Sequence, residues 1–199
     1  MLKLTKHVNT GKLAGFQSLN TSVLQNDYCT KMRANDSICS SCYAANMEKR
    51  YKGLRDNIVS NGELLSNSII DRDQLPYLFN MSVFRLHSTG ELINETHFVN
   101  FINLALKNKQ VRFVLWTKRI DIVNKVLRSL KLPSNLDLIF SNPKVNSQDI
   151  EPPKHFIKVF SVYTKDGAEG LDINCRSKCK DCMNCYTTND IKNIREIIK

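Results

Sequence analysis

Cysteines are the residues of this sequence best suited to chemistry, and they fall into two groups. The first group has the spacing C-x9-C-x2-C and consists of Cys29, Cys39 and Cys42. The second has the spacing C-x3-C-x2-C-x2-C and consists of Cys175, Cys179, Cys182 and Cys185. More than 130 residues without a cysteine separate them. Thiolates are ligands for zinc and for iron–sulfur clusters, so both groups are candidate metal sites.

The second group places four thiols within eleven residues, and Lys178 and Lys180 beside them favour the ionised thiolates. Structural zinc usually takes two cysteine pairs separated by a longer loop, whereas iron–sulfur clusters are held by compact runs. The spacing therefore favours a [4Fe–4S] cluster, with a structural zinc site as the alternative.

The first group offers three thiols in one loop, with no fourth protein ligand nearby in the sequence. Three ligands leave one position of a [4Fe–4S] cluster open for a small molecule. In the alternative, one of the four later cysteines completes this site, so that both ends of the chain share one cluster. The sequence predicts one cluster or two.

The net charge and the number of cysteines limit the partners and the cellular compartment that this protein can have. The 199 residues carry 29 Lys and Arg against 19 Asp and Glu, a net charge of +10, which favours anionic partners such as nucleic acid, acidic small molecules or acidic proteins. No apolar run is long enough to cross a bilayer and no signal peptide is recognisable, so we expect a cytoplasmic protein without a membrane partner. Cytosolic thiols stay reduced, which favours metal ligation over disulfides.

The cysteines need elements to position them, and the pattern between the two groups predicts an α/β fold. Apolar runs rich in β-branched and aromatic residues predict strands at 13–20, 82–87, 111–116, 136–141 and 156–162. Helical periodicity predicts helices at 43–60, 71–80, 91–107, 120–130 and 190–198. The alternation predicts a largely parallel sheet flanked by helices, and the length favours a partial (β/α) barrel or an open curved sheet. We expect one compact domain with a core over 1–170 and a cysteine-rich segment with a terminal helix over 171–199.

Polar residues follow the predicted strands where each one ends. In parallel sheets these ends meet at one edge, where ligands bind. The predicted pocket is lined by Arg85, His87, Ser88, Glu91, Thr117, Lys118 and Asn142. Arg85 and Lys118 would contact a carboxylate or phosphate, Glu91 an amine, and His87 would relay a proton or complete an iron site. Taken singly, His87 and Arg85 also suit structural roles.

Two other features have a plainer interpretation. Trp116 could stack on a planar ligand, but such a tryptophan is more often part of the core. Lys107, Lys109 and Arg112 read as a solvated face, and no RNA-binding signature with interleaved aromatic residues is recognisable.

Five segments in this order resemble the phage-encoded gene product 88 family and related proteins that look like small radical-SAM enzymes. They are CSSCYA (39–44), FRLHSTGEL (84–92), FVLWTKR (113–119), FSNP (140–143) and the terminal cysteine run. The resemblance implies a viral protein in the host cytoplasm with a radical-SAM-like partial barrel and an auxiliary cluster at the C-terminal cysteines. Thr89-Gly90-Glu91 lies where radical-SAM proteins contact the amino group of S-adenosylmethionine. The C-x9-C-x2-C spacing departs from the usual C-x3-C-x2-C.

Two functions follow from these expectations. In the first, the protein is a [4Fe–4S] redox or radical enzyme with His87, Glu91 and Arg85 as candidate catalytic residues and S-adenosylmethionine as a second cofactor. Its expected cofactor-binding residues are Ser88, Thr89, Gly90, Glu91, Thr117, Lys118 and Asn142. In the second, it is a non-enzymatic iron–sulfur or zinc module that binds nucleic acid or a host protein through its basic surface.

Overall fold

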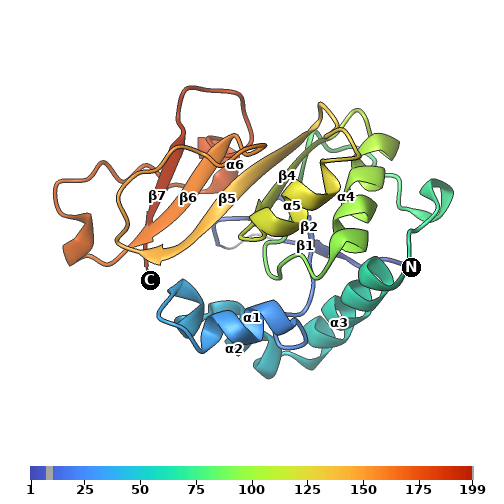
Figure 1. Ribbon diagram of the computed structural model, residues 1–199, viewed down its shortest axis with the longest axis horizontal. Coiled ribbons are helices and arrows are strands. Elements are labelled where there is room, and N and C mark those ends of the chain that lie inside the picture. Colours follow the sequence, from blue (N-terminus) through green and yellow to red (C-terminus); the bar gives the residue numbers. More distant parts are fainter. Residues whose placement is uncertain (8–10, 199) are drawn as a thin grey trace.

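The computed structural model describes residues 1–7 and 11–198, and these form an α/β fold around one sheet (Figure 1). Within the described residues the sheet has seven strands, which lie side by side in chain order. The strands are β1 (Leu4–Lys6), β2 (Gln17–Leu19), β3 (Val83–Leu86), β4 (Arg112–Thr117), β5 (Leu136–Val145), β6 (Lys158–Tyr163) and β7 (Asn193–Ile197). Only the β1–β2 pair is antiparallel. The predicted α/β class with a largely parallel sheet is therefore confirmed.

The helices complete the fold on one side and at one end of this sheet. They are α1 (Asp27–Arg33), α2 (Tyr43–Arg50), α3 (Lys52–Asn67), α4 (Glu95–Lys107), α5 (Ile120–Val126) and the single turn α6 (Cys179–Cys182). Three 3-10 turns accompany them: η1 (Ile38–Ser41), η2 (Arg72–Gln74) and η3 (Asp166–Ala168). Parallel strands in chain order, joined by right-handed crossovers, place their connecting helices on the same face.

That helical face holds the main hydrophobic core. Phe84 and Leu86 of β3 alternate with residues of the other face, and Phe113 and Leu115 do the same on β4. These side chains are fully buried against Phe98, Phe101 and Leu104 of α4 together with the apolar side of α5. Burying large side chains of this kind stabilises the fold by about 1.5–3 kcal/mol each, before conformational entropy is subtracted.

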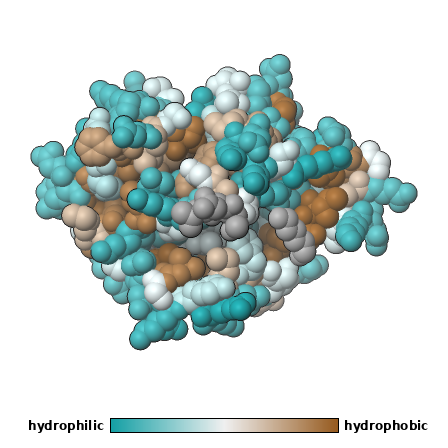
Figure 2. Space-filling view, turned by 180° about the vertical axis from the view of Figure 1, so that it is seen from behind, coloured by the Kyte–Doolittle hydropathy of each residue, from teal (hydrophilic) through white to brown (hydrophobic). Residues whose placement is uncertain are grey.

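The opposite face is covered by the cysteine-rich segment instead of by helices. Val114, Trp116 and Ile139 pack there against Phe16 and Tyr186. The central strands are thus covered on both faces, but the predicted flanking helices lie on one face, and the other carries only the single turn α6 of the cysteine-rich segment. Seen from behind, the molecule has a mostly hydrophilic rim with apolar patches exposed between (Figure 2).

Three predicted helices differ from the structure. The segment predicted as a helix over 190–198 forms β7, because its backbone pairs with β6 from Asn193 to Ile197 and buries Ile194. Local helical periodicity was overridden by sheet pairing, which sequence patterns weigh poorly. In 71–80 only the turn η2 is helical, since Pro76 confines Leu75 to extended backbone. The predicted helix 43–60 is broken at Tyr51, which has extended backbone between α2 and α3.

The end of the sheet toward which the parallel strands point is covered by α1, η1 and α2 (Figure 1). These elements follow β2 directly, and η1 lies against the end of β5. The cysteine-rich segment belongs to the same sheet, since β7 lies within 171–199 and forms its edge. Among the described residues, no helix combines the length and the apolar character needed to cross a membrane.

Candidate metal centre

The first cysteine group lies in the loop and short helices at the C-terminal edge of the sheet. Cys29 belongs to α1, Cys39 to η1, and Cys42 precedes α2. Asn26 caps α1, because its Oδ1 accepts hydrogen bonds from the backbone N–H groups of Tyr28 (3.0 Å) and Cys29 (3.4 Å). Ser37 caps η1 in the same way through the N–H of Cys39, at 3.2 Å. Capping therefore fixes the backbone next to two of the three thiols.

A buried carboxylate anchors this cysteine loop to the sheet. Glu48 of α2 is 1% exposed and accepts hydrogen bonds from the hydroxyl of Ser22 and from the N–H groups of Val23 (3.0 Å) and Leu24 (3.3 Å). The turn that leaves β2 is thus bound to the helix that follows the cysteines. Sequence reasoning missed Glu48, because nothing in the pattern distinguishes it from a solvated helical glutamate.

Burial is the largest influence on the pKa of two thiols in this group, Cys29 and Cys39. It raises the pKa of Cys29 to about 12, the negative charge of Glu91 adds to the rise, and Lys118 opposes it. Burial raises the pKa of Cys39 as well, again with Lys118 in opposition. Each of these thiols also feels the charge of Cys42, so the three sulfurs form one electrostatic group.

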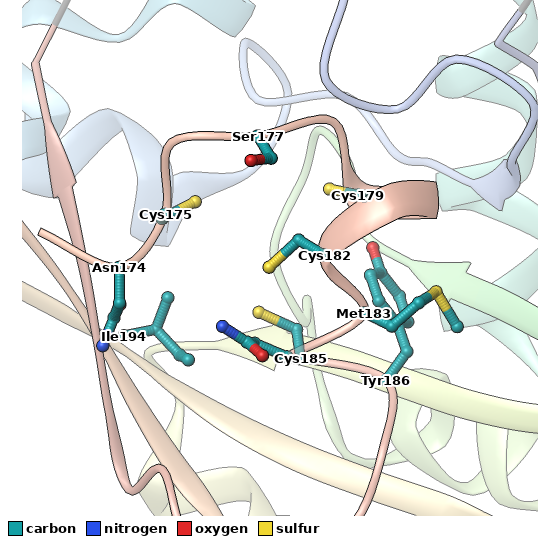
Figure 3. A pocket seen from close by; sticks show the side chains of 10 residues that line it. Asn174, Cys175, Ser177, Cys179, Cys182, Met183, Cys185, Tyr186 and Ile194 are labelled. Carbon is teal, nitrogen blue, oxygen red and sulfur yellow. The ribbon is translucent and has the colours of Figure 1, made fainter.

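The second cysteine group surrounds one pocket, and all four sulfurs point into it (Figure 3). The space measures about 270 Å³ when its open side is included. Its other walls come mainly from Tyr186 and Ile194, which are both buried. The pocket lies against the sheet face that carries Trp116.

A lysine from the N-terminal part of the chain holds this segment in place. The carbonyl of Lys12 accepts a hydrogen bond from the N–H of Cys179 at 2.7 Å. Its Nζ donates to the carbonyl of Cys175 at 2.8 Å, to the Sγ of Cys175 at 3.2 Å, and to Glu196 of β7. The Cys175 N–H also donates to the carbonyl of Arg195, at 3.0 Å. The cysteine segment is therefore fastened both to the edge strand and to the start of the chain.

The four thiols of the second group are partly buried. Burial raises the pKa of Cys185 to about 12, while the charge of Arg85 opposes the rise. Among the described residues, no three His, Cys, Asp or Glu side chains converge closely enough to hold a single metal ion. The four sulfurs line a space instead of meeting at a point.

Arg85 lies on the sheet face between the two cysteine groups. Its guanidinium carbon is 3.9 Å from the ring centroid of Trp116, and its Nη1 lies 3.5 Å from the hydroxyl of Tyr186. Burial opposes its charge, but the nearby Tyr186 and Tyr43 raise its pKa, and Cys179 contributes to the rise. Within the described part of the chain Arg85 forms no ion pair with a carboxylate.

The predicted turn Thr89-Gly90-Glu91 lies at the C-terminal end of β3, against the end of β2. Gly90 has φ +109°, and a Cβ there would lie 2.8 Å from the carbonyl oxygen and 2.9 Å from the nitrogen of Thr21. Only glycine fits this approach. The hydroxyl of Thr89 is buried and has no hydrogen-bond partner among the described residues.

Glu91 joins the ends of β3 and β4, as expected for residues of one pocket. Its carboxylate accepts hydrogen bonds from the N–H of Lys118 (2.8 Å), the hydroxyl of Thr117 and the N–H of Leu92 (2.8 Å). Its backbone carbonyl accepts from Asn26, at 3.0 Å, which connects it to the start of the first cysteine loop. The structure therefore brings Glu91, Thr117 and Lys118 together beside Cys29.

Ser88 is part of a buried network that also reaches the cysteine loop. Asn20, at the end of β2, accepts hydrogen bonds from the Ser88 N–H (2.8 Å), the Ser88 hydroxyl (2.9 Å) and the Thr89 N–H (3.2 Å). The hydroxyl of Tyr43, next to Cys42, donates to the Ser88 carbonyl at 2.8 Å. Asn20 was recognisable only as a polar residue at a strand end, and its central role depends on contacts distant in sequence.

Two residues of the predicted pocket make their contacts elsewhere. His87 packs against His97 and Phe101 of α4, with ring centroids 5.2 and 5.1 Å away, and burial lowers its pKa to about 3. Asn142 donates hydrogen bonds to Ser147 (2.6 Å) and Ser161 (3.3 Å). The Nε2 of His87 also lies 3.5 Å from the hydroxyl of Thr21, the residue against which Gly90 packs.

Comparison with known proteins identifies the family. No curated protein and no solved structure matches the chain. The family model described as Gene product 88 matches residues 2–196, which is nearly the whole chain. The protein therefore belongs to the gene product 88 family.

Proposed function

We propose that this protein is an iron–sulfur protein with two cluster sites. Cys175, Cys179, Cys182 and Cys185 would bind one [4Fe–4S] cluster completely. Cys29, Cys39 and Cys42 would bind a second through three irons, leaving the fourth iron open to a small molecule. The observation that carries the proposal is the convergence of four sulfurs on one pocket of the sheet face (Figure 3).

The chemistry of the donors and their surroundings fits such a cluster. A cluster with four thiolate ligands is anionic, and both Lys12 and Arg85 place positive charge next to its proposed ligands. The Lys12 bond to the Cys175 sulfur is of the kind that tunes iron–sulfur centres. For a single zinc ion, with Zn–S of about 2.3 Å, tetrahedral thiolates would stand about 3.8 Å apart, so the sulfurs would have to close in around a point.

We further propose that the fold is radical-SAM-like, a finer assignment than the α/β class. Two features of topology support it. The three-cysteine loop follows β2, the first of the parallel strands, and the Thr89-Gly90-Glu91 turn follows the next strand, β3. Both lie at the edge toward which the parallel strands point. Sheets with one helical face and sequential parallel strands also have the connectivity of a partial barrel.

The ligand of the open iron would then be S-adenosylmethionine, whose reductive cleavage by a cluster supplies radical chemistry. A carboxylate accepts about four hydrogen bonds, and Glu91 already uses three, so one acceptor position on Oε2 is left for an amino group. The other proposed binding residues are Ser88, Thr89, Gly90, Thr117, Lys118 and Asn142. Lys118, whose Nζ donates to Ser141 at 3.1 Å, would meet a carboxylate of the ligand.

Metal analysis after anaerobic purification tests the cluster assignment. We expect iron and sulfide for about two clusters, and the double variant Cys179→Ser/Cys182→Ser should lose about half of the iron. Ser177→Ala is the matched control, because Ser177 lines the same pocket without being a proposed ligand. Stoichiometric zinc without sulfide would overturn the proposal, and loss of all iron would replace two clusters by one shared cluster.

The role of S-adenosylmethionine is tested separately with the reduced protein. We expect binding that weakens in Glu91→Gln, and formation of 5′-deoxyadenosine after addition of a one-electron reductant. If the loaded protein neither binds nor cleaves S-adenosylmethionine, the radical-enzyme part fails while the cluster assignment stands. The remaining function would then be an iron–sulfur binding module.

A further inference from the structure

Two aromatic side chains stand exposed at the end of the sheet opposite to the cysteine loop. Tyr77 is 48% and Phe79 is 71% exposed, and their ring centroids are 4.6 Å apart. Leu78 between them is 2% exposed and belongs to the main core. Because successive side chains of extended backbone alternate, burying Leu78 turns both rings toward solvent.

Two polar side chains, buried Asn108 and exposed Gln110, fix this presentation. Asn108, which is fully buried, accepts a hydrogen bond from the Leu78 N–H at 2.7 Å and donates to the Pro76 carbonyl at 3.1 Å. Gln110 donates to the Leu78 carbonyl at 3.2 Å. The backbone that carries the aromatic pair is therefore fixed on both sides of Leu78. Keeping two neighbouring aromatic rings in contact with water forgoes the free energy that their burial would release. A fixed, exposed aromatic pair is therefore a candidate binding surface.

The surroundings of the pair are basic. Asn135 donates hydrogen bonds to the carbonyls of Ala105, Asn108 and Val111, which joins the segments 105–112 and 127–135 at this end of the sheet. Together with 75–82, these segments contain five cations and no acidic residue. Arg112 pairs with Asp137, but the other four form no ion pair within the described chain: Lys107, Lys109, Arg128 and Lys131. The Nζ of Lys107 donates hydrogen bonds to the carbonyls of Asp73 (3.0 Å) and Leu75 (2.7 Å), which keeps its charge beside the aromatic pair.

We propose that this basic aromatic rim, formed by Tyr77, Phe79, Lys107, Lys109, Arg128 and Lys131, binds single-stranded nucleic acid. Single strands expose base faces that stack on aromatic rings, and their phosphates attract unpaired cations. A duplex hides its base faces, so the exposed pair favours a single strand. The rim does not depend on the proposed clusters, because it lies on other elements and uses no cysteine.

Fluorescence anisotropy with a labelled oligonucleotide of about 12 nucleotides tests the proposal on the full chain with its metal content measured. We expect Tyr77→Ala and Phe79→Ala each to weaken binding by about 5- to 150-fold. The dependence of log K on log salt should have a slope of about −3 for four cations, and Lys109→Gln should reduce its magnitude by about 0.7. Tyr51→Ala and Lys165→Gln are matched controls, since both residues are exposed and lie away from the rim.

Every other outcome would overturn the proposal. These outcomes are no binding, binding unchanged by the aromatic variants, and binding of duplex as tight as that of the single strand. Phe79→Leu separates one further case, because it keeps an apolar side chain but removes the ring. A different result would identify the rim as a contact between copies of the chain. In that case the parent protein self-associates and does not bind nucleic acid, Phe79→Leu still self-associates, and Phe79→Ala does not.

Discussion

Arg85 lies over Trp116, with its guanidinium carbon 3.9 Å from the indole ring centroid, and this contact holds a cation between the two cysteine groups. The charge is felt by Cys179 and Cys185 on one side and by Tyr43, next to Cys42, on the other. Stacking on an aromatic face satisfies one side of the guanidinium without neutralising it. The positive charge therefore remains available to an anionic group bound at the cysteines.

We predict that Arg85→Gln lowers the reduction potential of a cluster at Cys175, Cys179, Cys182 and Cys185. Removal of a nearby cation destabilises the more negative reduced form, by about 1–2 kcal/mol, which corresponds to about 40–90 mV for one electron. Potentiometric titration followed by electron paramagnetic resonance measures the shift. Arg85→Lys should restore most of the potential, whereas unchanged potential with full iron content in Arg85→Gln would contradict the electrostatic role.

We predict that Gly90→Ala destabilises the protein more than Gly170→Ala does. Both glycines have positive φ, at +109° and +74°, but only at Gly90 would a Cβ press on the backbone of Thr21, since Gly170 faces open space. We expect about 1 kcal/mol of lost stability at Gly170 and about 3 kcal/mol or more at Gly90. Urea unfolding measures both, and equal losses would show that the turn relaxes around the added methyl group.

Local patterns were sufficient to predict the central strands but not the edge of the sheet. β3 and β4 lie within one residue of their predicted ranges, and β6 lies within two. β4 is a nearly continuous apolar run, as expected of a strand buried on both faces, whereas Arg85 interrupts the apolar residues of β3 and Ser161 those of β6. β1 has three residues and β7 reads as a helix, and both owe their structure to pairing with a neighbour. Strand pairing between distant segments leaves no periodic signal in either one.

The same distinction applies to the candidate site. The spacing of the cysteines and the strand-end residues Glu91, Thr117 and Lys118 could be identified from sequence, because parallel strands end at one edge. Glu48 and Asn20 could not, since their importance comes from hydrogen bonds to residues that are far away in the chain. His87 was expected in the pocket, but its φ of +62° accompanies packing of the ring among the aromatic rings of α4.

We predict that stability falls as the pH is lowered through 6.5, because His87 and His97 are buried without charge. Burial lowers the pKa of His87 to about 3 and the pKa of His97 well below 6.5. The two rings face each other, and the positive charges of Arg85 and Lys118 also oppose protonation of His87. The unfolded chain binds protons near pH 6.5 and the folded chain does not. Their stability contribution is complete above 6.5 and decreases by about 1.4 kcal/mol per histidine per pH unit below it.

Urea unfolding between pH 7 and pH 5 measures this slope. In His97→Leu, which keeps an apolar side chain in the core, the slope should become shallower by about 1.4 kcal/mol per pH unit. Equal slopes in His97→Leu and in the parent protein would show that His97 becomes charged in the folded state.

We predict that Glu48→Ala selectively disables the first cysteine group. Glu48 is buried and receives three hydrogen bonds from the turn at Ser22, Val23 and Leu24, so removing it leaves those donors unsatisfied at a cost of about 1–3 kcal/mol each. The loop that carries Cys29, Cys39 and Cys42 then loses its anchor, while the second group keeps its attachment through Lys12. Iron content should fall by about half, and the remaining cluster should show the reduction potential of the parent protein's second site.

Glu48→Gln is the control, because it keeps one acceptor oxygen and should retain more iron than Glu48→Ala. Equal loss of iron from both cysteine groups would mean that Glu48 supports the whole fold instead of the loop.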